Sequence, residues 1–325
     1  MKEAGSRLLP LAAMLALAGI VAQPPVVAAA SAPVKSAMKT VANQQNGNAT
    51  VKHSVAAAAS KAAEQGRSTV IKEAVTALAD VDKALILLDK GKKKEALDAL
   101  AEATGKLELV VARDPSLTLA PVAVHVTAKD LIASVDTIDE AVERARKYLS
   151  DGEVQKARVV LANLASELVV TVTNIPLGTF PAAIKAVSPL IDQGKIGEAK
   201  AALVTALSTL VDVDTVIPLP VLRAELLLEK AEALAEKRDR SDAQDESLAI
   251  LLSQARYQLK IAKALGYGKK SDFRDYYRMI DEIQEKTHNG GFGTGFFDKI
   301  KAKLKALTET NAKASGSPSV QHPKK

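Results

Sequence analysis

Histidines and carboxylates are the side chains of this sequence that could bind a metal or carry protons. The four histidines are His53, His125, His288 and His322, and there is no cysteine. None of these histidines has a second histidine or a carboxylate at the spacing of a known metal motif. We therefore expect no metal site and no cofactor.

His125 lies in an apolar stretch, residues 122–126. A hydrogen-bonded structural histidine is one interpretation of that setting. The other is a pH sensor, because imidazole titrates near neutral pH. The sequence leaves both open.

Three carboxylates, Asp136, Asp139 and Glu140, fall on one expected helix. General acid–base catalysis needs a pair of titratable groups that face a cleft, and the spacing of these three does not predict one. No nucleophile with a partnered base stands out either. We therefore predict that the protein is not an enzyme.

A glycine-rich segment, NGGFGTG at residues 289–295, could in principle cradle a phosphate. It matches neither the dinucleotide fingerprint nor the P-loop pattern, and no strand is expected before it. The segment instead predicts a turn that leads into a final helix at residues 294–310, with Thr294 as its N-cap.

Aromatic side chains are concentrated near the C-terminus, where eight of the ten lie within residues 257–297. Tyrosine and phenylalanine combine a large apolar area with few rotatable bonds, which suits a recognition surface, a small-molecule pocket or an interface. Aromatic rings at helical spacing also close a helical core, and that interpretation is the more common one. The candidate recognition or interface residues are Tyr257, Tyr267, Phe273, Tyr276 and Tyr277.

A repeated spacing indicates how the chain positions these residues. Each of three glycines is followed 24 residues later by a proline, in the pairs Gly91 and Pro115, Gly152 and Pro176, Gly194 and Pro218. Apolar residues precede each glycine at 3, 7, 10 and 14 positions and follow it at 5, 9 and 16, which keeps them on one helix face. Each unit is therefore predicted to be an αα-hairpin with a glycine cap, whose second helix ends at the proline.

These hairpins favour an all-α fold, a compact multi-helix bundle built from repeated αα-hairpins. The glycine-to-glycine distances are unequal, which argues against a regular open solenoid. The third hairpin carries Pro189 and is expected to be kinked there. A short β-branched run at residues 169–173 is interpreted as a helix end.

The two ends of the chain differ from its middle. Lys2 and Arg7 precede an apolar run at residues 8–22, and small residues follow at 28–30, so residues 1–30 are predicted to be a secretory signal peptide. Residues 31–50 are expected to form a flexible linker, residues 51–312 a helical domain, and residues 313–325 a disordered tail.

The formal net charge of +6 comes from 44 basic and 38 acidic residues that are mixed along the chain. Because no basic stripe is interleaved with aromatic residues, we expect no nucleic-acid binding. The apolar stripe of the final helix, Phe296 to Leu307, is expected to dock on the bundle. No stable membrane insertion is expected once the signal peptide has been removed.

Four stretches are long and specific: LLDKGKKKEALDAL (87–100), IPLGTFPAAIKAVSPLIDQGKIGEAKAAL (175–203), VIPLPVLRAE (216–225) and ARYQLKIAKALGYGKKSDFRDYY (255–277). Through them the sequence resembles the YfdX family of exported bacterial proteins, over roughly residues 52–290. The resemblance implies a mostly helical, periplasmic, oligomer-forming protein linked to acid or drug stress. It implies chaperone-like behaviour, no established enzymatic activity and no catalytic residue to carry over.

We therefore predict a periplasmic, stress-associated, non-enzymatic binding protein, with chaperone-like activity toward client polypeptides or small molecules, that forms a homo-oligomer. The alternative is an oligomeric structural or interaction module that binds a dedicated periplasmic partner.

Overall fold

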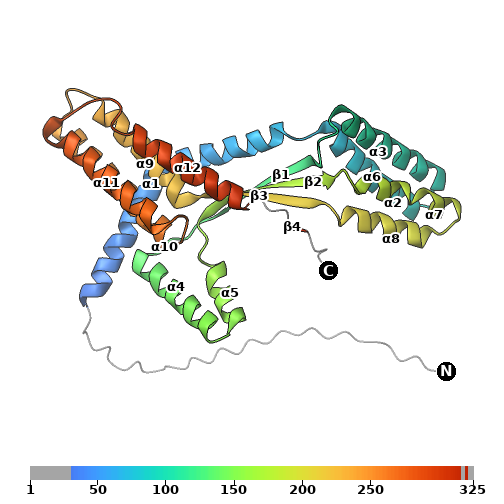
Figure 1. Cartoon of the computed structure of the whole chain (residues 1–325), viewed down its shortest axis with the longest axis horizontal. Coiled ribbons are helices and arrows are strands. Elements are labelled where there is room, and N and C mark those ends of the chain that lie inside the picture. The colour runs from blue at the N-terminus through green and yellow to red at the C-terminus, as the bar shows by residue number, and fades with distance from the viewer. Residues whose placement is uncertain (1–30, 316–318, 321–325) are drawn as a thin grey trace, which may run out of the picture.

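The computed structural model describes residues 31–315 and 319–320, most of them helical, around a small antiparallel sheet (Figure 1). The predicted signal peptide at residues 1–30 lies outside the described residues. So does most of the expected disordered tail at 313–325, apart from the last turn of α12 and the strand β4 (Ser319–Val320).

The all-α prediction holds for most of the described chain, but it is wrong for the residues that form the sheet. β1 (Leu119–Lys129), β2 (Glu167–Pro176) and β3 (Val211–Pro218) lie side by side in chain order, and β4 pairs with the start of β3. A bulge between Pro121 and Ala123 interrupts the pairing of β1 with β2.

The β-branched run at residues 169–173 lies inside β2, so its interpretation as a helix end is wrong. Each of these residues pairs with one on β1 and one on β3, and β-branched side chains pack well on such a pleated surface. Pro176 and Pro218 consequently end strands rather than helices. Only Pro115 follows a helix, α3.

The three predicted helical hairpins are present. They are formed by α2 (Lys72–Asp89) with α3 (Lys93–Arg113), by α4 (Val135–Ser150) with α5 (Val154–Ala162), and by α6 (Phe180–Lys185) and α7 (Ser188–Asp192) with α8 (Ile196–Leu207). Gly91, Gly152 and Gly194 have φ angles of 71°, 75° and 76°, which confirms the left-handed cap. The expected kink near Pro189 is the break between α6 and α7.

Sheet topology separates the hairpins. Because successive strands run in opposite directions, helices inserted after them emerge at alternate ends of the sheet (Figure 1). Hairpins α2–α3 and α6–α8 meet at one end and share a core, the first helical group. Hairpin α4–α5 lies at the other end. The expected single compact bundle is therefore wrong, because the core is divided in two.

The second helical group is built from the N- and C-terminal parts of the described chain. It contains α1 (Ser31–Ser68), α9 (Leu219–Ala235), α10 (Asp242–Ala264), α11 (Lys270–Thr287) and α12 (Asp298–Ser315). Ser241 caps α10 with a capping box.

The first part of α1 corrects the expected linker at 31–50, which is helical in the structure. The middle of α1, around Val51 and Val55, packs against α9 and α10. Gln44 is buried and donates from Nε2 to the Leu131 carbonyl at 3.0 Å, and Val51 is fully buried. These contacts order a stretch whose polar composition alone predicted no structure.

The final helix starts at Asp298, later than predicted, so Thr294 is not its cap. Its apolar stripe is docked on the second helical group, as expected: Phe297, Ile300, Leu304 and Leu307 are buried. The stripe brings α12 against α9 and α11, and this packing creates the cleft that follows.

Candidate binding cleft between α11 and α12

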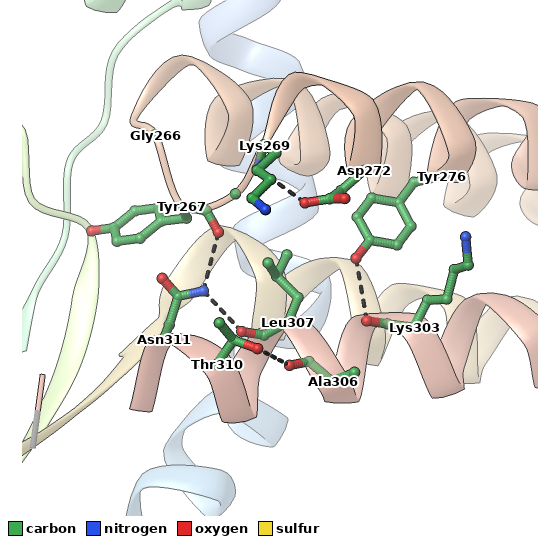
Figure 2. Close-up of a pocket in the computed structure, with 11 residues that line it drawn as sticks. Gly266, Tyr267, Lys269, Asp272, Tyr276, Lys303, Ala306, Leu307, Thr310 and Asn311 are labelled. Carbon is green, nitrogen blue, oxygen red and sulfur yellow. Dashed lines mark hydrogen bonds between the residues drawn. The ribbon is translucent and has the colours of Figure 1, made fainter. Parts of the chain in front are cut away.

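A cleft of about 580 Å³ lies where the turn after α10 meets the start of α11 and the middle of α12 (Figure 2). We call it the α11–α12 cleft. It is lined by Gly266, Tyr267, Gly268, Lys269, Asp272, Tyr276, Lys303, Ala306, Leu307, Thr310 and Asn311.

Two glycines shape the turn that forms one wall. Gly266 has a φ of 81° and follows the end of α10, where a residue without a Cβ adopts the left-handed conformation most easily. Gly268 lies against both neighbouring helices, since a Cβ there would stand 3.1 Å from Leu307 Cδ1 and from the Phe273 ring. A larger residue at 268 would push the turn away from α12 and change the shape of the cleft.

Tyr267 ties this turn to the sheet and to α12. Its hydroxyl accepts a hydrogen bond from the Ser166 N–H at 2.9 Å and donates to Glu167 Oε2 at 3.0 Å. Its backbone carbonyl accepts from Asn311 Nδ2 at 3.0 Å (Figure 2). Burial raises the pKa of Tyr267, so the phenol stays protonated as a donor.

Tyr276 holds α11 to α12 from the opposite side of the cleft. Its hydroxyl donates to the Lys303 carbonyl at 3.2 Å, and its ring meets Phe273 edge to face with centroids 5.8 Å apart. Burial raises the pKa of Tyr276 to about 12. Phe273 is fully buried behind the cleft wall.

Two of the three charged side chains that line the cleft, Asp272 and Lys303, already have partners within the protein. Asp272 Oδ2 accepts from the Lys269 backbone N–H at 3.0 Å and caps α11. The Lys303 ammonium donates to Asp275 at 2.9 Å and holds the pKa of that carboxyl below its usual range. The Lys269 ammonium forms no ion pair within the part of the chain that the structure describes.

The arrangement is suited to binding. Both phenols are held protonated by burial and are already hydrogen-bonded, so neither is placed to act as a base at neutral pH. What remains is an apolar floor at Leu307 and Ala306, bordered by one unpaired ammonium group and amide and hydroxyl groups. That combination is typical of a site that recognises a ligand with an apolar part and an anionic group.

The five aromatic candidates are therefore only partly brought together. Tyr267 and Tyr276 line the cleft and Phe273 supports it, whereas Tyr257 on α10 and Tyr277 on α11 do not contribute to its walls. Tyr277 is half-buried with the Arg256 guanidinium 5.4 Å from its ring centroid. The preferred interpretation, that the rings complete a helical core, describes Phe273 and Tyr276 well.

Sequence reasoning missed the polar half of the cleft. Asn311, Thr310 and Lys303 lie on α12, whose polar residues read as an ordinary solvated face. Lys269 and Asp272 read as part of a helix start. The one sequence signal for the cleft is the pair of glycines at 266 and 268, just before a helix. Two glycines so close together indicate a turn that lies against another element.

The other candidate residues lie apart from the cleft. His125 is exposed on β1, and Asp136, Asp139 and Glu140 are exposed on α4. Within the described residues, no group of three or more histidines or carboxylates is arranged to hold a metal. No helix there is both long and apolar enough to cross a membrane.

The glycine-rich segment forms a turn, as predicted, and Arg240 holds it in place. The buried guanidinium donates from one terminal nitrogen to the Gly291 carbonyl at 2.7 Å and from Nε to Asp245 at 2.6 Å. The Gly293 N–H donates to the Ala235 carbonyl at the end of α9. The segment therefore links α11 to α12 through protein contacts.

The part of the chain that matches known proteins contains nearly all of the three hairpins and of the sheet. Residues 77–216 match the model of the YfdX protein family, a narrower range than the resemblance in the sequence. The solved structure of Salmonella Typhi YfdX is similar at 16% identity and a TM-score of 0.32, over 46% of this chain and 93% of that one. No curated protein matches the chain. The α11–α12 cleft lies outside the matched residues.

Proposed function

Because residues 77–216 match the model of the YfdX protein family, we propose that this chain is a periplasmic, stress-associated binding protein without enzymatic activity. Its role is chaperone-like: it takes up exposed segments of client polypeptides, or small molecules of similar chemistry. The basic residues, apolar run and small residues of the first 30 positions support export to the periplasm.

The observation that carries this proposal is the α11–α12 cleft. Its volume is within the range of ligand sites, its floor is apolar, and its polar groups are hydrogen-bonded to the protein. The unpaired Lys269 ammonium favours clients that place a carboxylate near an apolar residue. A cleft with these contents binds a segment and releases it unchanged.

Aggregation of an unfolding client protein tests the proposal. The full chain should suppress aggregation at a near-stoichiometric ratio, at acidic or neutral pH. Ala306→Trp should abolish most of the protection, because Ala306 is exposed at the cleft and an indole would fill it. Ala302→Trp is the matched control, since Ala302 is exposed on the same helix but does not line the cleft.

Equal protection by both variants would exclude the cleft as the binding site. No protection by the wild-type chain across acidic and neutral pH would contradict the chaperone-like function itself.

An oligomeric interaction module is the second candidate function. A different observation favours it, the four exposed apolar side chains of hairpin α4–α5, which are Leu149, Val154, Val159 and Leu161. Enrichment of a single protein on the immobilised full chain from periplasmic extract would support a dedicated partner, and an empty result would count against one.

A further inference from the structure

A second cavity lies where α1, which packs against α9 (Figure 1), meets the segment after β1. Its volume is about 310 Å³, and it shares no lining residue with the α11–α12 cleft. We call it the α1 cavity. At roughly 30 Å³ for each water-sized group, it has room for about ten non-hydrogen atoms. It therefore suits a small organic molecule and is too small for a polypeptide segment of several residues.

Two contacts hold the walls of the α1 cavity together. Gln44 on α1 donates from Nε2 to the Leu131 carbonyl at 3.0 Å, which ties α1 to the segment after β1. Arg223 on α9 donates to Asp130 of the same segment, at 2.9 and 2.7 Å. Because all three elements are tied to one another, the cavity is largely formed before a ligand enters, as small-molecule sites usually are.

The charged side chains that line the α1 cavity sum to one positive charge. Asp130 and Arg223 neutralise each other in their ion pair. The third charged residue, Lys52, is exposed on α1 and forms no ion pair within the residues that the structure describes. The cavity therefore favours a ligand with a single negative charge.

Neutral and buried donors at the cavity wall indicate which anion fits. Asn48 Oδ1 accepts from Gln258 Nε2 at 2.8 Å, which leaves the Nδ2 donor of Asn48 unused within the described structure. Arg223 is 6% exposed, so packing fixes its position, and its Nε has no hydrogen-bond partner among the described residues. A carboxylate, whose two oxygens accept several hydrogen bonds, matches such donors and the Lys52 ammonium.

Apolar side chains form the rest of the wall. Ala49 and Val55 lie on the face of α1 that borders the cavity, and Ile132 lines it from the segment after β1. Ile132 is 53% exposed, although it is a large apolar residue. A ligand with an apolar body would remove part of this surface from water, which favours binding.

We infer that the α1 cavity binds a small organic monocarboxylate, with its carboxylate at Lys52 and Asn48 and its apolar body against Ile132 and Val55. The site goes beyond the matched family region, because α1 and α9 both lie outside residues 77–216. It is also independent of client binding at the α11–α12 cleft.

Fluorine NMR of 4-fluorobenzoate, added to the full chain, tests this site. The fluorine signal should shift or broaden to saturation, with a dissociation constant of about 1 mM or lower for a ligand of about ten non-hydrogen atoms. The neutral isostere 4-fluorobenzamide should bind about tenfold more weakly, because it offers Lys52 no charge-assisted hydrogen bond.

Substitutions on α1 locate the bound probe. Lys52→Gln should weaken the binding of 4-fluorobenzoate about tenfold, through loss of the same charge-assisted bond. Ala49→Trp should abolish the binding, because Ala49 is exposed at the cavity and an indole would fill it. Ala56→Trp is the matched control and should bind as wild type, since Ala56 is exposed on the same helix but does not line the cavity. Lys269→Gln, in the α11–α12 cleft, should also leave the affinity unchanged.

Any of three results would overturn the inference. The first is no saturable binding of 4-fluorobenzoate to the wild-type chain, or equal binding of the benzamide. The second is wild-type affinity in Lys52→Gln or in Ala49→Trp. The third is a loss in Lys269→Gln that equals the loss in Lys52→Gln, which would place the probe in the α11–α12 cleft. Circular dichroism of each variant should match wild type, because all the substituted α1 residues are exposed.

Discussion

Glu225 shows how one side chain can make stability depend on pH. It lies on α9 facing α12, where Thr308 Oγ1 donates to its carboxyl at 3.5 Å. Burial, with a smaller contribution from the neighbouring Glu229, raises the pKa of Glu225 to about 7. The folded state therefore favours the protonated carboxyl.

Stability should consequently fall as the pH rises. Below the unfolded pKa near 4.5 both states hold the proton, and Glu225 makes no difference. Between pH 4.5 and 7 the unfolded state loses its proton first, and the free energy of unfolding drops by about 2–3 kcal/mol.

Glu225→Gln should remove this loss: the variant should melt higher than wild type at pH 8 and the same at pH 4. Glu229→Gln should recover only a fraction of the lost stability. Glu229 is exposed, and it raises the pKa of Glu225 less than burial does. If the melting temperatures of wild type and Glu225→Gln differed by the same amount at every pH from 4 to 8, Glu225 would not be the source of the pH dependence.

Arg223 and Asp130 form an ion pair that joins α9 to the segment after β1. The guanidinium, 6% exposed, donates two hydrogen bonds to the carboxylate, at 2.9 and 2.7 Å. Asp130→Ala should cost about 3 kcal/mol in urea unfolding, because it leaves a buried charge unpaired. Adding Arg223→Met to Asp130→Ala should recover part of that loss. Strictly additive costs would show that the pair is not coupled.

At the scale of elements, the capping glycines predict a measurable asymmetry. Gly91 has positive φ and would have no atom within 4 Å of an added Cβ, so Gly91→Ala should cost about 1 kcal/mol through backbone strain alone. Gly105, inside α3, has equal space but lacks positive φ, so Gly105→Ala should stabilise by about 0.5–1 kcal/mol. Denaturant unfolding measures both, and shifts of the same sign would contradict the capping role.

Helices were predictable from the sequence because their signals are local. The apolar ladder and the glycine cap lie within one hairpin, so residues such as Ala84 and Gly91 carry the information themselves. Strands depend on pairing: residues 169–173 become a strand because β1 and β3 flank them, and those partners lie 39 to 50 residues away along the chain. The proline at a fixed distance from each glycine did not distinguish a helix end from a strand end.

At the scale of the whole molecule, the division of the core could not be read from the repeat. Equal hairpins suggested one bundle, but insertion between antiparallel strands places successive hairpins at opposite ends of the sheet. The cleft depends on the same arrangement. Tyr267 and Asn311 are 44 residues apart and meet only because α12 folds back along α11.

Hydrogen–deuterium exchange of the full chain tests most directly whether the α11–α12 cleft is the binding site. We expect a stoichiometric unfolded client to slow the exchange of backbone amides in residues 266–272 and 303–311, and to leave α2–α3 unchanged. Unaltered exchange at both cleft segments, in a sample where the client is demonstrably bound, would contradict that function for the cleft.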